Sequence, residues 1–263
     1  MVTVAVNGAA GRMGQRIVAM VVADERCELV SAIESAENPH LGEDAGEVAG
    51  VSATGVTIDT GSGGESDVLI DFSAPDACMK RAEECVKSDT ALVVGTTGFA
   101  EAQEERLVSE IADSIPVLVA PNMGLGVNLL FRLAGEVASA LGTDYDVEIV
   151  EAHHRRKKDA PSGTAGKLAE NVCEALDLDF RDTVINGRDG FTGERSSAEI
   201  GVHAVRGGSI VGEHTVIYAG EGERIELTHR AESRDVFAQG AVRAALFLHD
   251  KAPGLYDMGD VLF

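Results

Sequence analysis

A glycine-rich turn between two apolar segments constrains the fold of this chain most strongly. Residues 2–6 have the composition of a strand, Gly8, Gly11 and Gly14 follow at three-residue spacing, and residues 17–21 have helical periodicity. A strand, turn and helix of this kind let backbone N–H groups approach a pyrophosphate at the positive end of the helix dipole. The spacing G-x-x-G-x-x-G differs from the commoner G-x-G-x-x-G, and a glycine triplet alone also suits a purely structural turn.

An acidic residue at the appropriate distance supports the dinucleotide interpretation. Glu34 lies twenty residues beyond Gly14, at the end of a second apolar run over residues 27–33. A carboxylate in this position accepts hydrogen bonds from the hydroxyls of an adenosine ribose. The motif and the acid together predict a dinucleotide site.

Strand and helix patterns alternate through the first half of the chain and predict a Rossmann-like, doubly wound parallel sheet of the α/β class. Strands are expected near residues 2–6, 27–33, 67–71, 91–95 and 116–120. Helices are expected near residues 11–22, 75–87, 100–112 and 124–141. Ligands of such sheets bind beyond the carboxyl ends of the strands. The glycine motif, Glu34, residues 95–97 and residues 120–123 all follow predicted strands. The segment 41–66 predicts at most one short strand.

The pattern changes after about residue 141. Hydrophobic residues alternate with period two, which is typical of strands. One helix is expected to begin after Ser162, whose side chain would cap it. A last helix should pack back on the first domain. The strands are expected at 145–150, 198–206, 209–218 and 225–228, and the helices at 164–176 and 235–248. We therefore predict a dinucleotide-binding domain of residues 1–124 and 235–263, and a mixed α+β substrate-binding and oligomerisation domain of residues 125–234.

Residues 151–165 bring the most chemical groups together in the shortest span. His153 and His154 are followed by four consecutive cations and then by Pro161-Ser162-Gly163-Thr164, in a chain with 22 Lys+Arg against 44 Asp+Glu. Such a cluster suits the binding of a small polyanion such as a dicarboxylate, and the histidines and Lys157 could move protons there. The alternative is a solvated charge run in a surface loop.

These motifs resemble those of the dihydrodipicolinate reductase family over nearly the whole chain. The matching segments are residues 6–14, 95–98, 120–123, 126–130, 151–165, 206–208 and 212–214. The family signature E-x-H-H-x-x-K-x-D-x-P-S-G-T-A is matched in full and is highly specific, whereas the glycine motif alone is not. Two residues depart from the pattern: Gly124 replaces a frequent Ser, and Ser35 follows Glu34 where some members have Arg.

The resemblance implies an enzyme that reduces 4-hydroxy-tetrahydrodipicolinate to tetrahydrodipicolinate with NADH and/or NADPH, in diaminopimelate and lysine biosynthesis. It implies His153 as the general acid/base and Lys157 as a second proton donor. Substrate-binding residues would be His154, Gly163 and Thr164. Cofactor-binding residues would be Gly8, Ala9, Ala10, Gly11, Arg12, Met13, Glu34, Gly95, Thr96, Thr97, Ala120, Pro121, Asn122 and Met123. It also implies a homotetramer built through the sheet of the second domain. For Arg206, a structural ion pair and a substrate contact remain equally open.

Cofactor choice depends on the residues around the ribose. Glu34 should accept hydrogen bonds from both ribose hydroxyls of NADH, whereas the 2′-phosphate of NADPH would meet that carboxylate with no Arg at position 35. Arg12 is the only nearby cation that could compensate for this repulsion. We therefore expect both cofactors to work, with NADH at least as good.

Charge and composition exclude several classes of partner. A net charge of −22 argues against nucleic acid, and the chain has no apolar run near eighteen residues, so no membrane association is predicted. The four cysteines lack C-x-x-C spacing, which favours buried thiols over metal or disulfide roles. The N-terminus begins directly with a strand and no signal-like segment, so a cytoplasmic location is expected.

The sequence leaves three other functions open, and it also leaves open whether the protein is adapted to high salt. The chain could be another two-domain nicotinamide dehydrogenase acting on an amino acid such as aspartate. It could also be a cofactor-sensing regulator without turnover, or a structural acidic protein. Dispersed acids with only six lysines resemble proteins adapted to high salt, and an ordinary acidic protein is the alternative.

Overall fold

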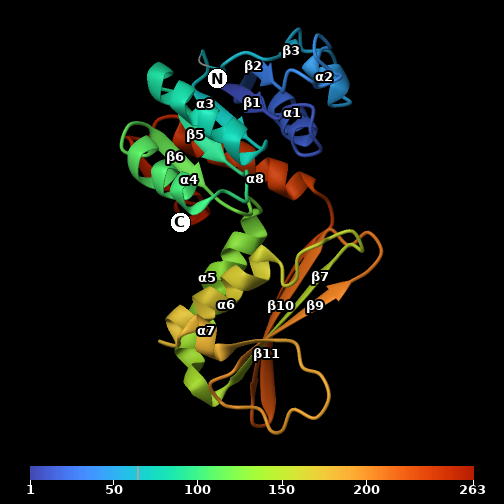
Figure 1. The fold of residues 1–263 in the computed structure, drawn as a ribbon, viewed down its shortest axis with the longest axis vertical. Helices are drawn as coiled ribbons and strands as arrows, with labels where there is room; N and C mark the ends of the chain where they lie inside the picture. The colour runs from blue at the N-terminus through green and yellow to red at the C-terminus, as the bar shows by residue number, and fades with distance from the viewer. Residues whose placement is uncertain (64) are drawn as a thin grey trace. The chain divides into compact units, whose positions relative to one another are not determined.

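The first unit of the structure is built on a parallel sheet with the strand order β12-β6-β5-β4-β1-β2-β3 (Figure 1). The computed structural model describes residues 1–63 and 65–263, and it divides into Met1–Leu125 with Arg234–Phe263, and Gly126–Ser233. The strands of the first unit are β1 (Val2–Asn7), β2 (Cys27–Ile33), β3 (Ile58–Asp59), β4 (Val68–Asp71), β5 (Ala91–Val94), β6 (Pro116–Val119) and β12 (Gly254–Tyr256). Its helices are α1 (Gly14–Ala23), α2 (Ala45–Val48), α3 (Pro75–Ser88), α4 (Glu101–Arg106) with a π-helical turn (Leu107–Ile111), α8 (Asp235–Leu248) and α9 (Met258–Leu262).

Helices cover both faces of this sheet. Successive residues of a strand point to opposite faces, so Val68 and Ile70 of β4 pack with α1 and α8, whereas Leu69 packs with α3 and the π-helical turn. All three side chains are fully buried. This two-sided burial explains the continuous apolar strands, which are typical of parallel sheets. The α/β fold expected from the sequence is therefore confirmed.

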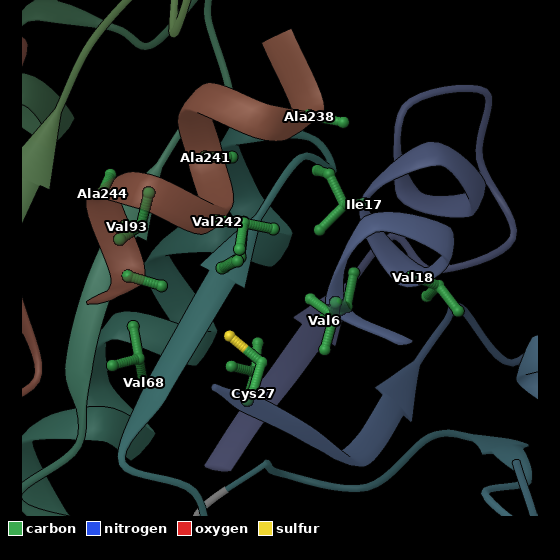
Figure 2. Packing of buried hydrophobic residues seen from close by; sticks show 14 of the residues in the cluster. Val6, Ile17, Val18, Cys27, Val68, Val93, Ala238, Ala241, Val242 and Ala244 are labelled. Carbon is green, nitrogen blue, oxygen red and sulfur yellow. The ribbon is translucent and has the colours of Figure 1, made fainter. Parts of the chain in front are cut away.

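Helix α8 returns to the first unit after the second, as the sequence predicted. Its small residues Ala238, Ala241 and Ala244 join the same core as Val93 of β5 and Ile17 of α1 (Figure 2). Its backbone at Gly240 lies so close to Met123 that no side chain fits, because a Cβ there would lie 1.7 Å from the Met123 carbonyl oxygen. The contact fixes the loop that follows β6.

Several short elements were not predicted in detail. Helix α2 is capped by Asp44, whose carboxylate accepts hydrogen bonds from the backbone N–H groups of Gly46 and Glu47. Helix α1 begins at Gly14 instead of residue 11, because residues 8–13 form the turn and Gly8 adopts a φ of +79°. Elements of two to five residues carry no periodicity that a sequence pattern can detect.

The second unit contains a mixed sheet in the order β11-β10-β7-β9-β8. Its strands are β7 (Asp146–His153), β8 (Val184–Asn186), β9 (Ile200–Arg206), β10 (Gly212–Gly220) and β11 (Glu223–Ala231), and its helices are α5 (Leu125–Leu141), a 3-10 turn (Gly142–Asp144), α6 (Gly163–Ala175) and α7 (Phe180–Thr183). Helices α5 and α6 share one core with β7, β9 and β10 (Figure 1). The buried Tyr218 hydroxyl donates to the Ala134 carbonyl at 2.6 Å and ties β10 to α5.

By length and composition alone, the segment Leu125–Asp144 could cross a membrane, which was not predicted from the sequence. The segment carries Arg132 and Glu136, which form an ion pair at 2.6 Å. Its buried side chains, among them Leu130 and Ala134, belong to the core of the second unit. This is the pattern of an amphipathic helix packed on a sheet.

Candidate functional site

A buried carboxylate organises the carboxyl edge of the parallel sheet. Asp71 ends β4 and is fully buried. It accepts hydrogen bonds from Asn7 Nδ2 at 2.6 Å, Ser73 Oγ at 2.8 Å and Thr96 Oγ1 at 2.6 Å. These partners lie at the end of β1 and just after β4 and β5, so one side chain ties together the ends of three neighbouring strands. Thr96 therefore links the loop after β5 to Asp71, and its hydroxyl also accepts a hydrogen bond from the Ser73 N–H.

The turn after β1 packs so tightly that Gly8 and Gly14 have no room for a side chain. A Cβ on Gly8 would lie 2.6 Å from the Phe72 carbonyl oxygen, and one on Gly14 would lie 2.0 Å from the Gly8 carbonyl oxygen. Both contacts are closer than real Cβ atoms allow. Residues 14–17, the first turn of α1, carry no acidic side chain, so the positive end of this helix is unopposed there. The turn fits a dinucleotide pyrophosphate.

A cavity of about 520 Å³ adjoins this turn. Its lining includes Gly8, Gly11, Glu34 and Ser35, together with Lys80 of α3. The Glu34 carboxylate accepts the Ala10 N–H at 3.1 Å and the Ser35 N–H at 3.0 Å. Each carboxylate oxygen has a second lone pair, so Glu34 can still accept hydrogen bonds from ribose hydroxyls.

The cations around this cavity differ from those expected. Lys80 and Arg81 both line it, whereas Arg12 does not. The prediction that Arg12 is the only nearby cation was therefore wrong. Arg81 is largely buried and pairs with Glu84 at 2.5 Å, whereas Lys80 is exposed. Both belong to α3, which reaches the cavity only through tertiary packing.

A second cavity, of about 250 Å³, is lined by seven more residues of the predicted nucleotide site. It is lined by Met13, Phe72, Gly95, Thr97, Ala120, Pro121, Asn122, Met123 and Phe237. Phe72 lines both cavities and explains Gly95, because a Cβ there would lie 2.1 Å from the Phe72 ring. Neither Phe72 nor Phe237 was predicted from the sequence. Ala9, Ala10, Arg12 and Thr96 line neither cavity.

In the second unit, a buried carboxylate is clamped near the end of β7. Glu151 is fully buried. Its oxygens accept Arg206 Nη1 at 2.6 Å and Nη2 at 2.7 Å, the Ser162 N–H at 3.0 Å, and pair with His153 Nδ1 at 2.7 Å. Burial alone would raise the pKa of Glu151, but the hydrogen bonds from Arg206, His153 and Ser162 hold it below its ordinary value. Arg206 is therefore an ion-pair partner of Glu151 in this structure.

His153 lies on the same strand face as Glu151, two residues further on. Burial lowers the pKa of His153 below its ordinary value, against the raising effect of the Glu151 carboxylate, and Lys157 and Arg206 lower it further. A lower pKa makes the protonated ring a stronger acid than an ordinary histidine. A Cβ on Gly212 would lie 3.2 Å from His153 Nε2, so the absence of a side chain at Gly212 leaves room beside this nitrogen.

The loop after β7 brings Lys157 into the same group. Its side chain is 21% exposed, and its Nζ lies 2.9 Å from Asp159 Oδ2. The loop ends at Ser162, whose hydroxyl accepts the Ala165 N–H and caps α6, as expected. Gly163 then opens the helix, and a Cβ there would meet no atom within 4 Å among the described residues. Space therefore exists beside the helix start that Gly163 and Thr164 form.

Two further histidines belong to this region. His214 Nε2 lies 3.1 Å from Ser162 Oγ, and its ring packs edge-on against His153 at 5.2 Å between centroids. Burial lowers the pKa of His214 to about 3, so the ring is neutral. His154, a predicted substrate residue, has a buried Nδ1 without a hydrogen-bond partner among the described residues. No role was predicted for His214, because only strand pairing places β10 beside β7.

Metal ligands are not grouped in the described residues. Over residues 1–63 and 65–263, no cluster of three or more His, Cys, Asp or Glu side chains is placed to hold a metal ion. The four cysteines are free and buried, as expected, and burial raises the pKa of each thiol.

Two family models match the chain end to end. Residues 2–123 match "Dihydrodipicolinate reductase, N-terminus", and residues 126–262 match "Dihydrodipicolinate reductase, C-terminus". The 4-hydroxy-tetrahydrodipicolinate reductase of Syntrophotalea carbinolica is 52% identical, over 100% of this chain and 99% of the relative. That of Geobacter sulfurreducens is 50% identical over the same shares.

Solved structures agree with the sequence matches. A dipicolinate-bound dihydrodipicolinate reductase from Paenisporosarcina sp. TG-14 is 25% identical, with a TM-score of 0.78 and full coverage of both chains. GenD2 from gentamicin A biosynthesis, in complex with NAD, is 13% identical, with a TM-score of 0.60 over 99% of this chain and 90% of that one. The second match concerns the fold alone.

Proposed function

The chain belongs to the dihydrodipicolinate reductase family, and we propose that it reduces 4-hydroxy-tetrahydrodipicolinate to tetrahydrodipicolinate with NADH or NADPH, a step of diaminopimelate and lysine biosynthesis. One observation carries this proposal. The signature from residue 151 to 165 folds into a single group that holds a buried Glu-His pair, a half-buried lysine and an open helix start. These are the groups that a dicarboxylate and a proton transfer require.

The substrate residues have distinct roles in this proposal. A reduced nicotinamide supplies the hydride. The ring of the substrate gains that hydride after loss of water, negative charge develops on the conjugated system, and His153 delivers a proton from Nε2. Lys157 is the second proton donor. His154, Gly163 and Thr164 bind the substrate carboxylates, and the dipicolinate bound to the Paenisporosarcina reductase supports a dicarboxylate ligand.

Cofactor binding falls to the first unit. The backbone of residues 8–13 would hold the pyrophosphate, Glu34 the adenosine ribose, and residues 95–97 and 120–123 the nicotinamide half. The cavity geometry around Gly8 and Gly95 supports this division. Glu34 followed by Ser35 favours NADH, and Lys80 supplies a cation for the 2′-phosphate of NADPH. We therefore expect both cofactors to work, with NADH at least as good.

We also propose a homotetramer located in the cytoplasm. The sheet face of the second unit that α5 and α6 do not cover would provide the subunit contact. Val205 on this face is 48% exposed. Four free, buried cysteines support a reducing compartment.

An assay with freshly made substrate tests the activity. Dihydrodipicolinate synthase would generate the substrate, and the loss of NADH or NADPH absorbance would be followed with aspartate dehydrogenation as the comparison reaction. We expect turnover of the synthase product and none of aspartate. Cofactor binding without turnover of the synthase product would favour a sensing protein, and aspartate turnover would favour the amino-acid dehydrogenase.

A further inference from the structure

The Glu151 carboxylate has the geometry of a positioning group for His153. Glu151 lies on β7 with its side chain fully buried, and His153 Nδ1 lies 2.7 Å from one of its oxygens. A carboxylate accepts hydrogen bonds only, so Nδ1 must carry the proton in this contact. The other ring nitrogen, Nε2, is then the only site at which His153 can exchange a proton.

Arg206 and Ser162 prevent the Glu151 carboxylate from turning. The guanidinium forms a two-pronged contact with both oxygens, and the Ser162 N–H binds the oxygen that His153 does not contact. Arg206 is itself held, because its Nη2 donates to the Asp159 carbonyl at 2.7 Å. A two-pronged contact fixes the plane of a carboxylate, which a single hydrogen bond does not.

The Nε2 side of the ring is kept open. A Cβ on Gly212 would lie 3.2 Å from Nε2, so glycine at this strand position preserves the space. No hydrogen bond to Nε2 occurs within the part of the chain that the structure describes. The edge-on His214 ring packs against the imidazole at 5.2 Å and limits its rotation.

We propose that Glu151, clamped by Arg206, is the positioning residue that fixes the tautomer and orientation of His153 and makes Nε2 the proton-donating atom. This inference rests on the proposed function, in which His153 is the general acid. In the donating step, the N–H bond at Nε2 breaks, the proton moves to the ring of the reduced substrate, and neutral His153 keeps its proton on Nδ1. Solvent then restores the proton on Nε2.

Charged and titratable groups face His153 from four places. They are Glu151 on β7, Lys157 on the following loop, Arg206 on β9 and His214 on β10. Of these, the carboxylate of Glu151 forms a hydrogen bond with the ring at 2.7 Å, and it favours the protonated imidazole. Because a general acid acts in its protonated form, kcat/KM falls as pH rises through the pKa of His153. Loss of the Glu151 charge must move this alkaline limb to lower pH.

The test is a double-mutant cycle with a pH profile. Glu151→Gln should lower kcat/KM by roughly 10- to 100-fold, the scale for losing a carboxylate that orients a metal-binding histidine. Its alkaline limb should shift to lower pH, and Glu151→Asp should recover part of the activity. In a His153→Ala background, Glu151→Gln should cause no further loss, because it acts through the missing ring.

Glu148→Gln is the matched control. Glu148 lies on the same strand but on the opposite face, and it pairs with Arg188, Arg195 and His203. Its loss removes a similar arginine-bound carboxylate without touching His153, so the pH profile should not move. If Glu151→Gln fails to fold, Arg206→Lys replaces it in the cycle. That variant keeps the cation and loses the two-pronged contact.

The outcomes separate this inference from the proposed function. Additive losses in the cycle, or an unshifted alkaline limb in a folded Glu151→Gln variant, would overturn the positioning role alone. Near-normal turnover by His153→Ala would instead overturn the assignment of His153, on which the inference rests.

Discussion

Lys80 offers the sharpest test of cofactor recognition. It is exposed on the wall of the cavity that also contains Glu34 and Ser35, whereas its neighbour Arg81 is occupied by Glu84. A cation about 4 Å from a phosphate in a water-like dielectric contributes about 1 kcal/mol. This corresponds to a change of about 5-fold in kcat/KM at room temperature.

Lys80→Ala should therefore lower kcat/KM for NADPH by about 5-fold and leave that for NADH nearly unchanged, because only NADPH carries the 2′-phosphate. The assay is steady-state kinetics with both cofactors in dilute buffer and in molar salt. The effect should shrink at high salt, where the screening length falls to about 3 Å.

Lys87→Ala provides the control for this prediction. Lys87 lies on the same helix and lines a different cavity, with Glu83 and Arg106. It should change neither cofactor's kinetics. An unchanged ratio of NADPH to NADH efficiency in Lys80→Ala, or an equal loss for both cofactors, would refute the role of Lys80.

Three further outcomes follow from the structure and the sequence. Lys157→Ala should lower turnover by roughly 10²–10⁴-fold without weakening cofactor binding, and weaker binding with intact chemistry would show that Lys157 belongs to the other pocket. Ser35→Arg should improve kcat/KM for NADPH more than for NADH, and equal changes would contradict the ribose-site assignment. With a net charge of −22, the melting temperature should rise steeply between dilute buffer and molar salt, and a flat curve would remove the high-salt interpretation.

The parallel sheet could be predicted because burial on both faces leaves a strong local signal. The run that became β5 is apolar and buried throughout, and in the run that became β1 only Thr3 and Asn7 are polar. The glycine turn between the first strand and helix has few structural alternatives. Helix boundaries were less certain. The start of α1 shifted to Gly14 because the turn continues through residue 13, and local periodicity does not register such a turn.

Parts of the candidate site depend on contacts that a single sequence does not encode locally. Arg206 reaches Glu151 across 55 residues, and this contact requires the parallel pairing of β9 with β7, in which Arg206 lies opposite His153. Lys80 reaches the nucleotide cavity only after α3 packs on the sheet. The motif located His153, whereas the placement of Arg206 and His214 around it was found only in the folded chain.

The proposed mechanism depends above all on the delivery of a proton by His153 during reduction of the dicarboxylate substrate. This role is tested by comparing kcat of the wild type and His153→Ala with synthase-generated substrate, alongside the dissociation constant of each reduced cofactor. We predict that kcat falls by roughly 10²–10⁴-fold while cofactor affinity stays the same, because His153 lies outside the nucleotide-binding motifs. Near-normal kcat in this variant, or a loss explained entirely by weaker cofactor binding, would be incompatible with His153 as the proton donor.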